Sequence, residues 1–184
     1  MQDDVNGVSW VFAELLSMIG IDFFSIAVNP VRGARVKPFP GAFIWQGPSK
    51  RNILAWNGFH YLFGRSQVGF GNKEFTEKLL PRFMNKLEND DSYNYDFLYC
   101  ESTHPIRVDN GPPDERMPNF VKSWNENNEI KIEFLTVSEF GKKLNKDYKE
   151  KLKTLKGDWT DHWTDGPGSS SYETGLNRKT HELL

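Results

Sequence analysis

The feature that most constrains the fold is an amphipathic helix pattern followed directly by a short apolar run. Six apolar residues near the start of the chain recur at intervals of three and four: Val8, Val11, Phe12, Leu15, Leu16 and Ile19. This spacing predicts a helix that Asn6 or Ser9 caps and that ends at Gly20. Residues 21–28, with the sequence IDFFSIAV, have strand length and few polar side chains. Such a run is typical of a parallel strand covered on both faces, so the opening predicts an α/β fold.

The same alternation continues along the chain. Residues 42–46 and 53–57 predict a hairpin around a turn at residues 47–50. A helical stripe over residues 75–87 contains Pro81, which we expect to kink or split the helix. Further strands are expected at 95–100 and 130–135, with helices from about residue 114 and from 136 to 155. This order indicates parallel strands with right-handed crossovers, a fold in which ligand sites lie at the carboxyl ends of strands.

Helical spacing near the C-terminus runs to the last residues. Tyr172, Leu176, Leu183 and Leu184 lie at roughly helical intervals, and no stop signal follows them. We therefore expect the chain to be a piece of a larger protein, in which residues 172–184 start a following helical region.

The charge balance excludes several classes of partner. The 23 Lys and Arg residues against 25 Asp and Glu residues give a net charge of −2, so we expect neither nucleic acid nor a membrane as a partner. No run approaches the ~18 apolar residues of a membrane span, and acidic residues stand where a signal peptide is basic. The single cysteine, Cys100, excludes an internal disulfide and a site built from several thiolates. Together these features favour a cytoplasmic protein.

Asp3 and Asp4 directly precede the first predicted helix. Backbone N–H groups and the dipole at a helix N-terminus keep a carboxylate ionised, which suits a nucleophile or a metal ligand. The alternative is that the two acids only cap the helix.

The polar loop over residues 104–114 follows the strand expected at 95–100. It contains His104, Arg107, Asp109 and Asp114, and its position behind a strand makes it a candidate site. The alternative is a solvated loop in which Asp114 caps the next helix.

The loop at residues 157–166 packs Trp159, Asp161, His162 and Trp163 into a short stretch. Indole faces stack on sugar rings, and acids hydrogen-bond to hydroxyl groups, so these four residues are candidates for carbohydrate binding. The alternative is that the tryptophans plug the domain.

A family resemblance rests first on DVNGVS at residues 4–9, followed by a helix and by GIDFF at residues 20–24. These strings resemble the stretch around the catalytic aspartate of glycoside hydrolase family 38, the α-mannosidases. Similar strings follow in the family's order: NP at 29–30, AFIWQGP at 42–48, ILAWN at 53–57, TVSEF at 136–140 and GDWTDHW at 157–163. Over nearly its whole length the chain is thus similar to the family's N-terminal catalytic domain, particularly to a divergent bacterial branch.

The resemblance implies that residues 1–171 form part of a seven-stranded parallel β/α barrel, truncated at both ends. It also implies one zinc ion that holds vicinal sugar hydroxyls, and a retaining double displacement on α-mannosides or related glycans by two carboxylates. By position, Asp4 matches the family's nucleophile, which is also a zinc ligand. Asp109 is the nearest match to the general acid, and Asp114 is the second choice.

Most zinc ligands are expected outside this chain. The family's His-x-Asp pair belongs upstream of Met1, and a further His ligand belongs downstream of Leu184. Because a zinc site needs about four donors, we expect the isolated chain to be inactive. Two other functions remain open: a metal-dependent hydrolase similar to polysaccharide deacetylases, and a carbohydrate-binding protein without catalytic activity.

Overall fold

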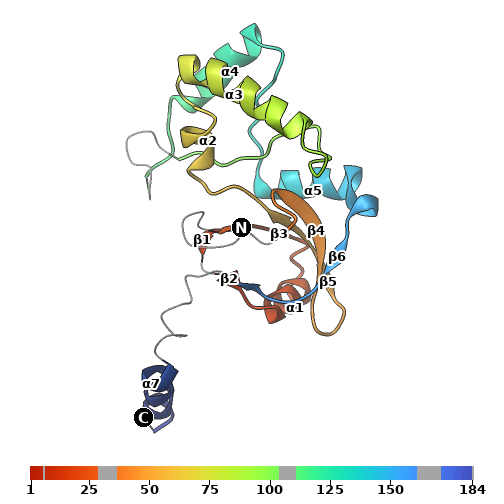
Figure 1. Cartoon of the computed structure of the whole chain (residues 1–184), viewed down its shortest axis with the longest axis vertical. Helices are drawn as coiled ribbons and strands as arrows, with labels where there is room; N and C mark the ends of the chain where they lie inside the picture. The colour runs from red at the N-terminus through yellow and green to blue at the C-terminus, as the bar shows by residue number, and fades with distance from the viewer. Residues whose placement is uncertain (6, 29–36, 104–110, 161–170, 184) are drawn as a thin grey trace.

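The computed structural model describes residues 1–5, 7–28, 37–103, 111–160 and 171–183. Within these residues the chain forms a five-stranded mixed sheet, a separate two-stranded pairing and six α-helices (Figure 1). The α/β class that the alternation of elements predicted is therefore confirmed. None of the helices in this part of the chain is long and apolar enough to cross a membrane.

The sheet has three parallel strands on one side and a hairpin on the other. In spatial order its strands are β1 (Gln2–Val5), β3 (Phe23–Val28), β5 (Asn52–Asn57), β4 (Gly41–Gln46) and β6 (Thr154–Leu155). β1, β3 and β5 run parallel, β4 is antiparallel to β5, and β6 is parallel to β4. The short strands β2 (Gly7–Val8) and β7 (Trp159–Thr160) pair antiparallel outside this sheet. The carboxyl ends of β1, β3 and β5 therefore lie along one edge.

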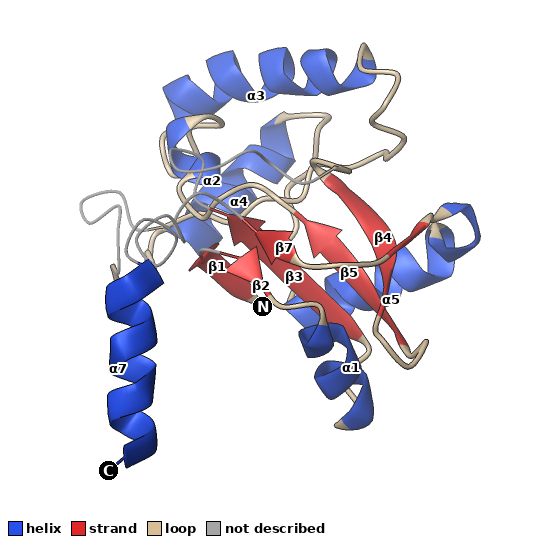
Figure 2. Ribbon diagram, turned by 60° about the horizontal axis from the view of Figure 1, so that its bottom comes forward, coloured by secondary structure: helices blue, strands red, loops and turns tan. Residues whose placement is uncertain are grey.

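Helices cover both faces of the sheet, and a separate helical layer lies beyond its carboxyl edge. α1 (Val11–Met18) packs against β4 and β5 on one face, and α5 (Val137–Asp147) packs against β3 on the other. The chain passes from the end of β5 into α2 (Phe63–Ser66), α3 (Lys73–Glu88) and α4 (Met117–Asn127), which form the separate layer (Figures 1 and 2). A 3₁₀ turn, η1 (Lys149–Lys151), follows α5, and α7 (Ser171–Leu183) ends the described chain.

Three apolar clusters form the core. The first lies between the sheet and α1, and its buried members are Ala13, Leu16, Phe24, Ile26, Phe43, Trp45, Ile53, Ala55 and Trp159. The second lies on the α5 face and is centred on Ala42, Leu54, Trp56, Phe140 and Leu144. The third lies among the helices of the separate layer and contains Phe59, Phe63, Val68, Leu80 and Trp124. The carboxyl edge of the parallel strands is thus bordered by packed apolar groups.

Elements with strong local signals form where they were predicted. β3 covers most of the apolar run at 21–28, and β4 and β5 form the predicted hairpin. α5 begins with a capping box, in which the Thr136 side chain accepts from the Glu139 backbone N–H and the Glu139 carboxylate accepts from the Thr136 N–H. This helix ends at Asp147, short of the predicted residue 155.

Pro81 neither splits nor ends its helix. It lies inside α3, which runs without interruption over Lys73–Glu88 and is capped by the Asn72 side chain at the Phe75 N–H. Of the two outcomes predicted for Pro81, the split into two helices is therefore wrong. The apolar stripe continues across the proline and packs Leu80 and Leu87 against the core on either side of it.

The segment at residues 95–100 does not join the sheet, although it was predicted as a strand. Its alternating rings, those of Tyr95, Phe97 and Tyr99, all lie against Trp56, with ring centroids 5.2, 5.9 and 6.1 Å away. The segment therefore crosses the face of the sheet, where its aromatic surface is buried, and does not extend the sheet at its edge.

The segment at residues 130–135 was also predicted as a strand and is not one. The Asn125 side chain takes the place of a neighbouring strand: its Oδ1 accepts from the Ile132 N–H at 2.8 Å and its Nδ2 donates to the Ile132 carbonyl at 2.8 Å. The Trp124 indole N–H also donates to the Ile130 carbonyl at 2.7 Å. Side chains of α4 thus satisfy the backbone that a sheet would otherwise pair.

The seven-stranded parallel barrel, of which the chain was expected to form part, is not shown by the observed sheet. The described residues form an open sheet of five strands, and one strand pairing within it is antiparallel. Two of the strands that the sequence suggested are diverted to other partners, as described above, so the described chain does not close a barrel.

Candidate active site

Asp3 and Asp4 lie in β1 and not at the mouth of a helix, where they were expected. β1 pairs with β3, with Asp3 opposite Ala27 and Val5 opposite Val28, so the register shifts between them at Asp4. Irregular strand pairing of this kind is frequent beside active sites. The carboxylate of Asp4 itself lies outside the described part of the structure.

Asp3 belongs to a cluster of polar groups on the α5 face of the sheet. Ser25 and Ala27 are two positions apart in β3 and therefore lie on the same face, and Asp3 in β1 lies opposite Ala27. The Tyr99 hydroxyl lies 3.5 Å from Oε1 of Glu101, and it also interacts with the side chain of Ser25. The Glu101 carboxyl in turn interacts with the carboxyl of Asp3. We call Asp3, Ser25, Tyr99 and Glu101 the carboxyl cluster.

The backbone of Glu101 is held in place by α2. The Gly64 N–H donates to the Glu101 carbonyl at 2.9 Å. A Cβ atom at residue 64 would lie 2.5 Å from that same carbonyl oxygen, which is closer than packed atoms approach. Only glycine allows α2 to contact the backbone at this point, so Gly64 fixes the position from which the Glu101 side chain extends.

The environment of Glu101 favours the protonated carboxyl. Burial raises the pKa of Glu101 above its ordinary value, while hydrogen bonds with Asp3 and Tyr99 act in the opposite direction. A hydrogen bond between two carboxyl groups requires a proton on one of them, so the pair holds a proton where exposed carboxyls are ionised. Burial also raises the pKa of Tyr99, which keeps its phenol protonated. This arrangement is typical of a group that donates or accepts a proton in catalysis.

Glu101 and Tyr99 were not among the site residues predicted from the motifs. Glu101 is the first acidic residue after the aromatic run at 95–99, and this position was the only local signal for it. The contact with Asp3 joins residues nearly a hundred positions apart, so it follows from the fold and not from a motif.

Asp114, the second choice for the general acid, is engaged elsewhere. Its two carboxylate oxygens accept from Nε and Nη2 of Arg116 at 2.8 and 3.0 Å, and Oδ1 also accepts from the Arg116 backbone N–H at 3.1 Å. A carboxylate held at two points by a guanidinium is a hydrogen-bond acceptor, not a proton donor. The N-cap residue of α4 is Arg116 and no side-chain hydrogen bond caps this helix, so the alternative that Asp114 caps it is not confirmed either.

The Gly157–Trp159 stretch is structural. The Trp159 ring is only 3% exposed and stacks against Trp45 in the first core cluster, so no face of the indole is left for a sugar. Oδ1 of Asp158 accepts from the backbone N–H of Trp10 at 2.5 Å, directly before α1. For Trp159, the interpretation as a core plug is therefore the one that the described residues support.

Four other predicted site residues lie outside the described residues. These are the general-acid candidate Asp109 and the carbohydrate-binding candidates Asp161, His162 and Trp163. Their roles stay predictions.

Zinc was expected to have most of its ligands outside this chain. The described residues contain no group of three or more His, Cys, Asp or Glu side chains that could hold a metal ion. Because a zinc site needs about four converging donors, these residues do not by themselves fit the ion.

A comparison with protein families decides the family of the chain. The family model described as "Glycosyl hydrolases family 38 N-terminal domain" matches residues 1–162. The chain belongs to glycosyl hydrolase family 38. The resemblance seen in the motifs from DVNGVS to GDWTDHW is therefore confirmed.

Solved structures support the same fold. The chain is similar to an α-mannosidase from Enterococcus faecalis V583, with a TM-score of 0.63 and 15% sequence identity. The match covers 85% of the family 38 chain described here but 17% of the mannosidase chain. No curated protein matches the chain. The family 38 chain thus spans about a sixth of the length of that solved relative.

Proposed function

We propose that this family 38 chain forms part of the catalytic site of a retaining glycoside hydrolase that acts on α-mannosides or related glycans. The observation that carries the proposal is the half-buried pair of Glu101 and Asp3, which directly precedes Asp4 in β1. A retaining glycosidase needs one carboxylate that stays ionised and one carboxyl that holds a proton. The proposal gives the ionised role to Asp4 and the protonated role to Glu101, whose pKa burial raises.

Asp4 is proposed as the nucleophile. Its carboxylate attacks the anomeric carbon, and the bond between that carbon and the leaving-group oxygen breaks. The product of this step is a glycosyl ester of Asp4, which water then hydrolyses to restore the carboxylate. The second displacement returns the original anomeric configuration.

Glu101 is proposed as the proton donor, because its surroundings favour the protonated form. It gives its proton to the leaving-group oxygen in the first step and takes one from the attacking water in the second. Asp109, which the family resemblance suggested for this role, stays the second candidate. Glu101 is supported by its contacts with Asp3 and Tyr99, whereas Asp109 is supported by its position in the motif order alone.

We expect zinc to bind only in a protein that supplies ligands beyond those of this chain. When bound, it would hold vicinal sugar hydroxyls, with Asp4 as one ligand. The roles proposed for Asp4 and Glu101 do not depend on it, since proton transfer and carbon–oxygen bond exchange involve the two carboxyls directly.

The proposal is tested by comparing Asp4→Asn, Glu101→Gln and Asp109→Asn in the full-length protein that contains this chain. Each is assayed on an α-mannoside with a good leaving group, such as 2,4-dinitrophenyl, and on one with a poor leaving group, such as methyl. Loss of the nucleophile removes turnover of both. Loss of the proton donor lowers the turnover rate of the methyl glycoside by about 10²- to 10⁴-fold. It spares the dinitrophenyl glycoside, because dinitrophenolate leaves without a proton. Asp114→Asn is the matched control and leaves both rates unchanged.

The outcomes separate the competing functions. A leaving-group-dependent loss in Asp109→Asn, with Glu101→Gln active, would transfer the proton-donor role to Asp109. Release of acetate from acetylated polysaccharide, without glycoside cleavage, would favour the deacetylase-like alternative. Glycan binding with no turnover of either substrate would favour a carbohydrate-binding protein.

A further inference from the structure

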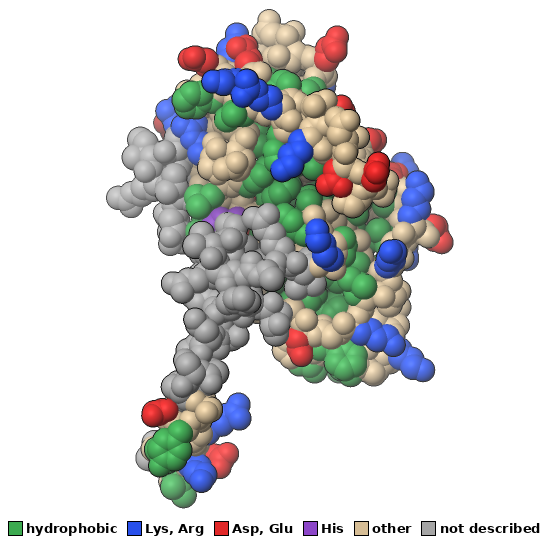
Figure 3. Space-filling view, viewed as in Figure 1, with side chains coloured by type: hydrophobic (Ala, Val, Ile, Leu, Met, Phe, Trp, Pro, Cys, Tyr) green, Lys and Arg blue, Asp and Glu red, His purple; other side chains and the backbone are tan. Residues whose placement is uncertain are grey.

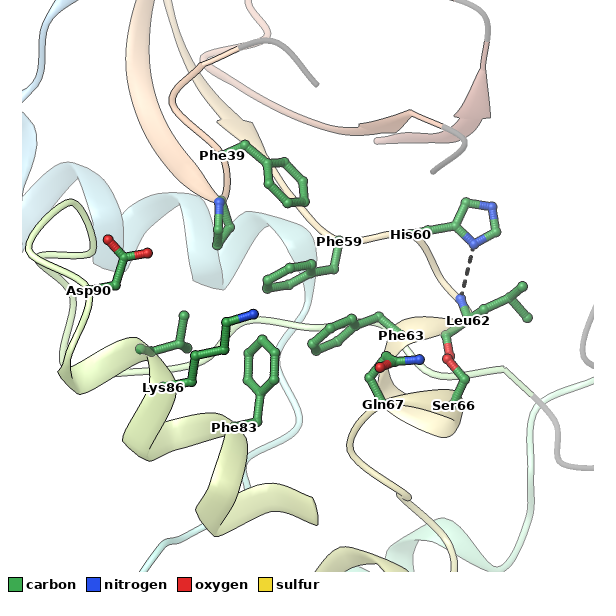
Figure 4. A pocket seen from close by; sticks show the side chains of 12 residues that line it. Phe39, Phe59, His60, Leu62, Phe63, Ser66, Gln67, Phe83, Lys86 and Asp90 are labelled. Carbon is green, nitrogen blue, oxygen red and sulfur yellow. Dashed lines mark hydrogen bonds between the residues drawn. The ribbon is translucent and has the colours of Figure 1, made fainter. Parts of the chain in front are cut away.

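A cavity of about 480 Å³ lies where the chain leaves β5 and enters the helical layer (Figure 4). Phe59 and His60 follow the end of β5 at Asn57 by two and three residues, and α2 and α3 supply half of the other lining residues. Figure 3 shows hydrophobic side chains at the surface between the helical layer and the sheet, with charged side chains around them. The volume lies in the range of small-molecule sites.

The cavity has an aromatic wall. Phe59 and Phe63 stack with ring centroids 3.9 Å apart, Phe39 meets Phe59 edge-on at 5.1 Å, and Phe83 meets Phe63 edge-on at 4.9 Å. Figure 4 shows these four rings lying side by side along the cavity. Contiguous ring faces and edges favour a flat apolar group, which can continue the same stacked and edge-on packing.

The rim of the cavity carries compensating charges. Lys86 places its ammonium 6.0 Å from the centre of the Phe83 ring, and the Asp90 carboxylate lies on the same side. Lys86 and Lys37 lower the pKa of Asp90, after the stronger effect of its hydrogen bonds with Ser92. His60 is oriented by the Leu62 N–H, which donates to its Nδ1 at 3.3 Å. A rim with both signs of charge gives no preference for a charged ligand.

The cavity wall and the backbone of the proposed proton donor both contact one helix, α2. Phe63 lines the cavity, and the next residue, Gly64, donates its N–H to the Glu101 carbonyl at 2.9 Å. In a glycosidase, the group on the far side of the protonated oxygen is the aglycone. We propose that this cavity binds the uncharged aromatic aglycone of a glycoside, an inference that rests on the proposed function.

The test fills the cavity from its exposed rim without removing a core residue. Ser66→Phe and Gln67→Phe each place a ring into the space, and both positions are exposed. Ser123→Phe is the matched control, because Ser123 is an exposed helical serine on α4 that does not line the cavity. Far-UV circular dichroism and thermal unfolding check that each variant is folded, and two filling variants guard against the failure of one.

Two measurements follow in the full-length protein. The first is the ratio of kcat/KM for benzyl α-mannoside to that for methyl α-mannoside, whose alcohol leaving groups are similarly basic. The second is saturation-transfer NMR with benzyl alcohol as a free aryl probe. Burial of one ring predicts a ratio of about 10 to 100 in the wild type. We expect the ratio to approach one in both filling variants, together with loss of the benzyl alcohol signal, while Ser123→Phe keeps both.

Each outcome has a distinct meaning. A benzyl alcohol signal that both filling variants abolish supports an aryl site whatever the turnover, so absent hydrolysis then counts against the proposed function alone. Hydrolysis of both mannosides with a wild-type ratio near one overturns the aglycone site and leaves the proposed function standing. A benzyl alcohol signal that survives in both filling variants also overturns it.

Discussion

Trp159 stacks on Trp45 with ring centroids 5.2 Å apart and an interplanar angle of 28°. The Trp45 indole N–H donates to the carbonyl of Gly157 at 3.0 Å, two residues before Trp159. The contact joins β7 to the hairpin of β4 and β5, and it completes the core cluster on the α1 face. The Gly-Asp-Trp string at residues 157–159 thus serves packing in this chain.

Trp159→Ala should unfold or strongly destabilise the protein. Removal of a fully packed indole leaves a cavity, and such changes cost about 3–5 kcal/mol. Trp159→Phe keeps part of the ring packing and should cost less. Chemical denaturation of the three proteins measures the difference. A stable Trp159→Ala protein that has lost only carbohydrate binding would contradict the structural role.

Asp158→Ala should weaken the start of α1. The carboxylate accepts from the Trp10 N–H, and loss of a side-chain acceptor at a helix N-terminus costs about 0.5–2 kcal/mol. Asp158→Asn keeps an acceptor oxygen and serves as the control. Equal unfolding free energies for the wild type and Asp158→Ala would show that this hydrogen bond does not contribute.

Glu14 should contribute more to stability than its ion-pair partner Arg51. Its carboxylate accepts from the Ser49 hydroxyl and from the Ser49 N–H, and it lies 3.2 Å from Nε of Arg51. Glu14→Ala removes the acceptor of these hydrogen bonds and should cost about 0.5–1.5 kcal/mol, because water can reach the exposed Ser49 donors. Arg51→Ala removes a half-exposed partner and should cost about 0–1 kcal/mol. Urea denaturation that ranks the two variants in the opposite order would contradict this expectation.

Stability should depend on pH through Glu101. Its pKa in the folded protein is raised by burial, so above its ordinary value of 4.5 the folded state holds a proton that the unfolded chain has lost. The free energy of unfolding therefore falls as the pH rises from that value through the raised pKa. Glu101→Gln should remove this slope and stabilise the protein at neutral pH. Denaturation at several pH values measures it, with the exposed Glu129→Gln as the control that keeps the slope.

Local signals predicted most of the individual elements. The capping box at Thr136 and Glu139 and the apolar run of β3 depend on neighbours within a few residues, and such patterns are visible in the sequence. β1 was missed because QDDV carries no apolar alternation, and its pairing depends on β3, about twenty residues away. Its two acids were therefore assigned to a helix mouth.

The candidate site was harder to predict than the fold. Asp4 was selected from a motif, but Glu101 became visible only when Tyr99 crossed the sheet and brought the next acidic residue to Asp3. The same aromatic alternation that made residues 95–100 look like a strand is satisfied by Trp56 on the face of the sheet. The periodicity of apolar residues predicts which side chains are buried, but it does not predict which part of the protein they pack against.

The Asn125 side chain bears on whether the protein aggregates at high concentration. An extended segment with free N–H and carbonyl groups can recruit strands from other molecules and start aggregates. At Ile132, in the middle of residues 130–135, both backbone groups are already bound to one amide side chain. The Asn125 amide thereby keeps these two backbone groups from pairing with a strand of another molecule, next to the exposed side chains of Phe134 and Leu135.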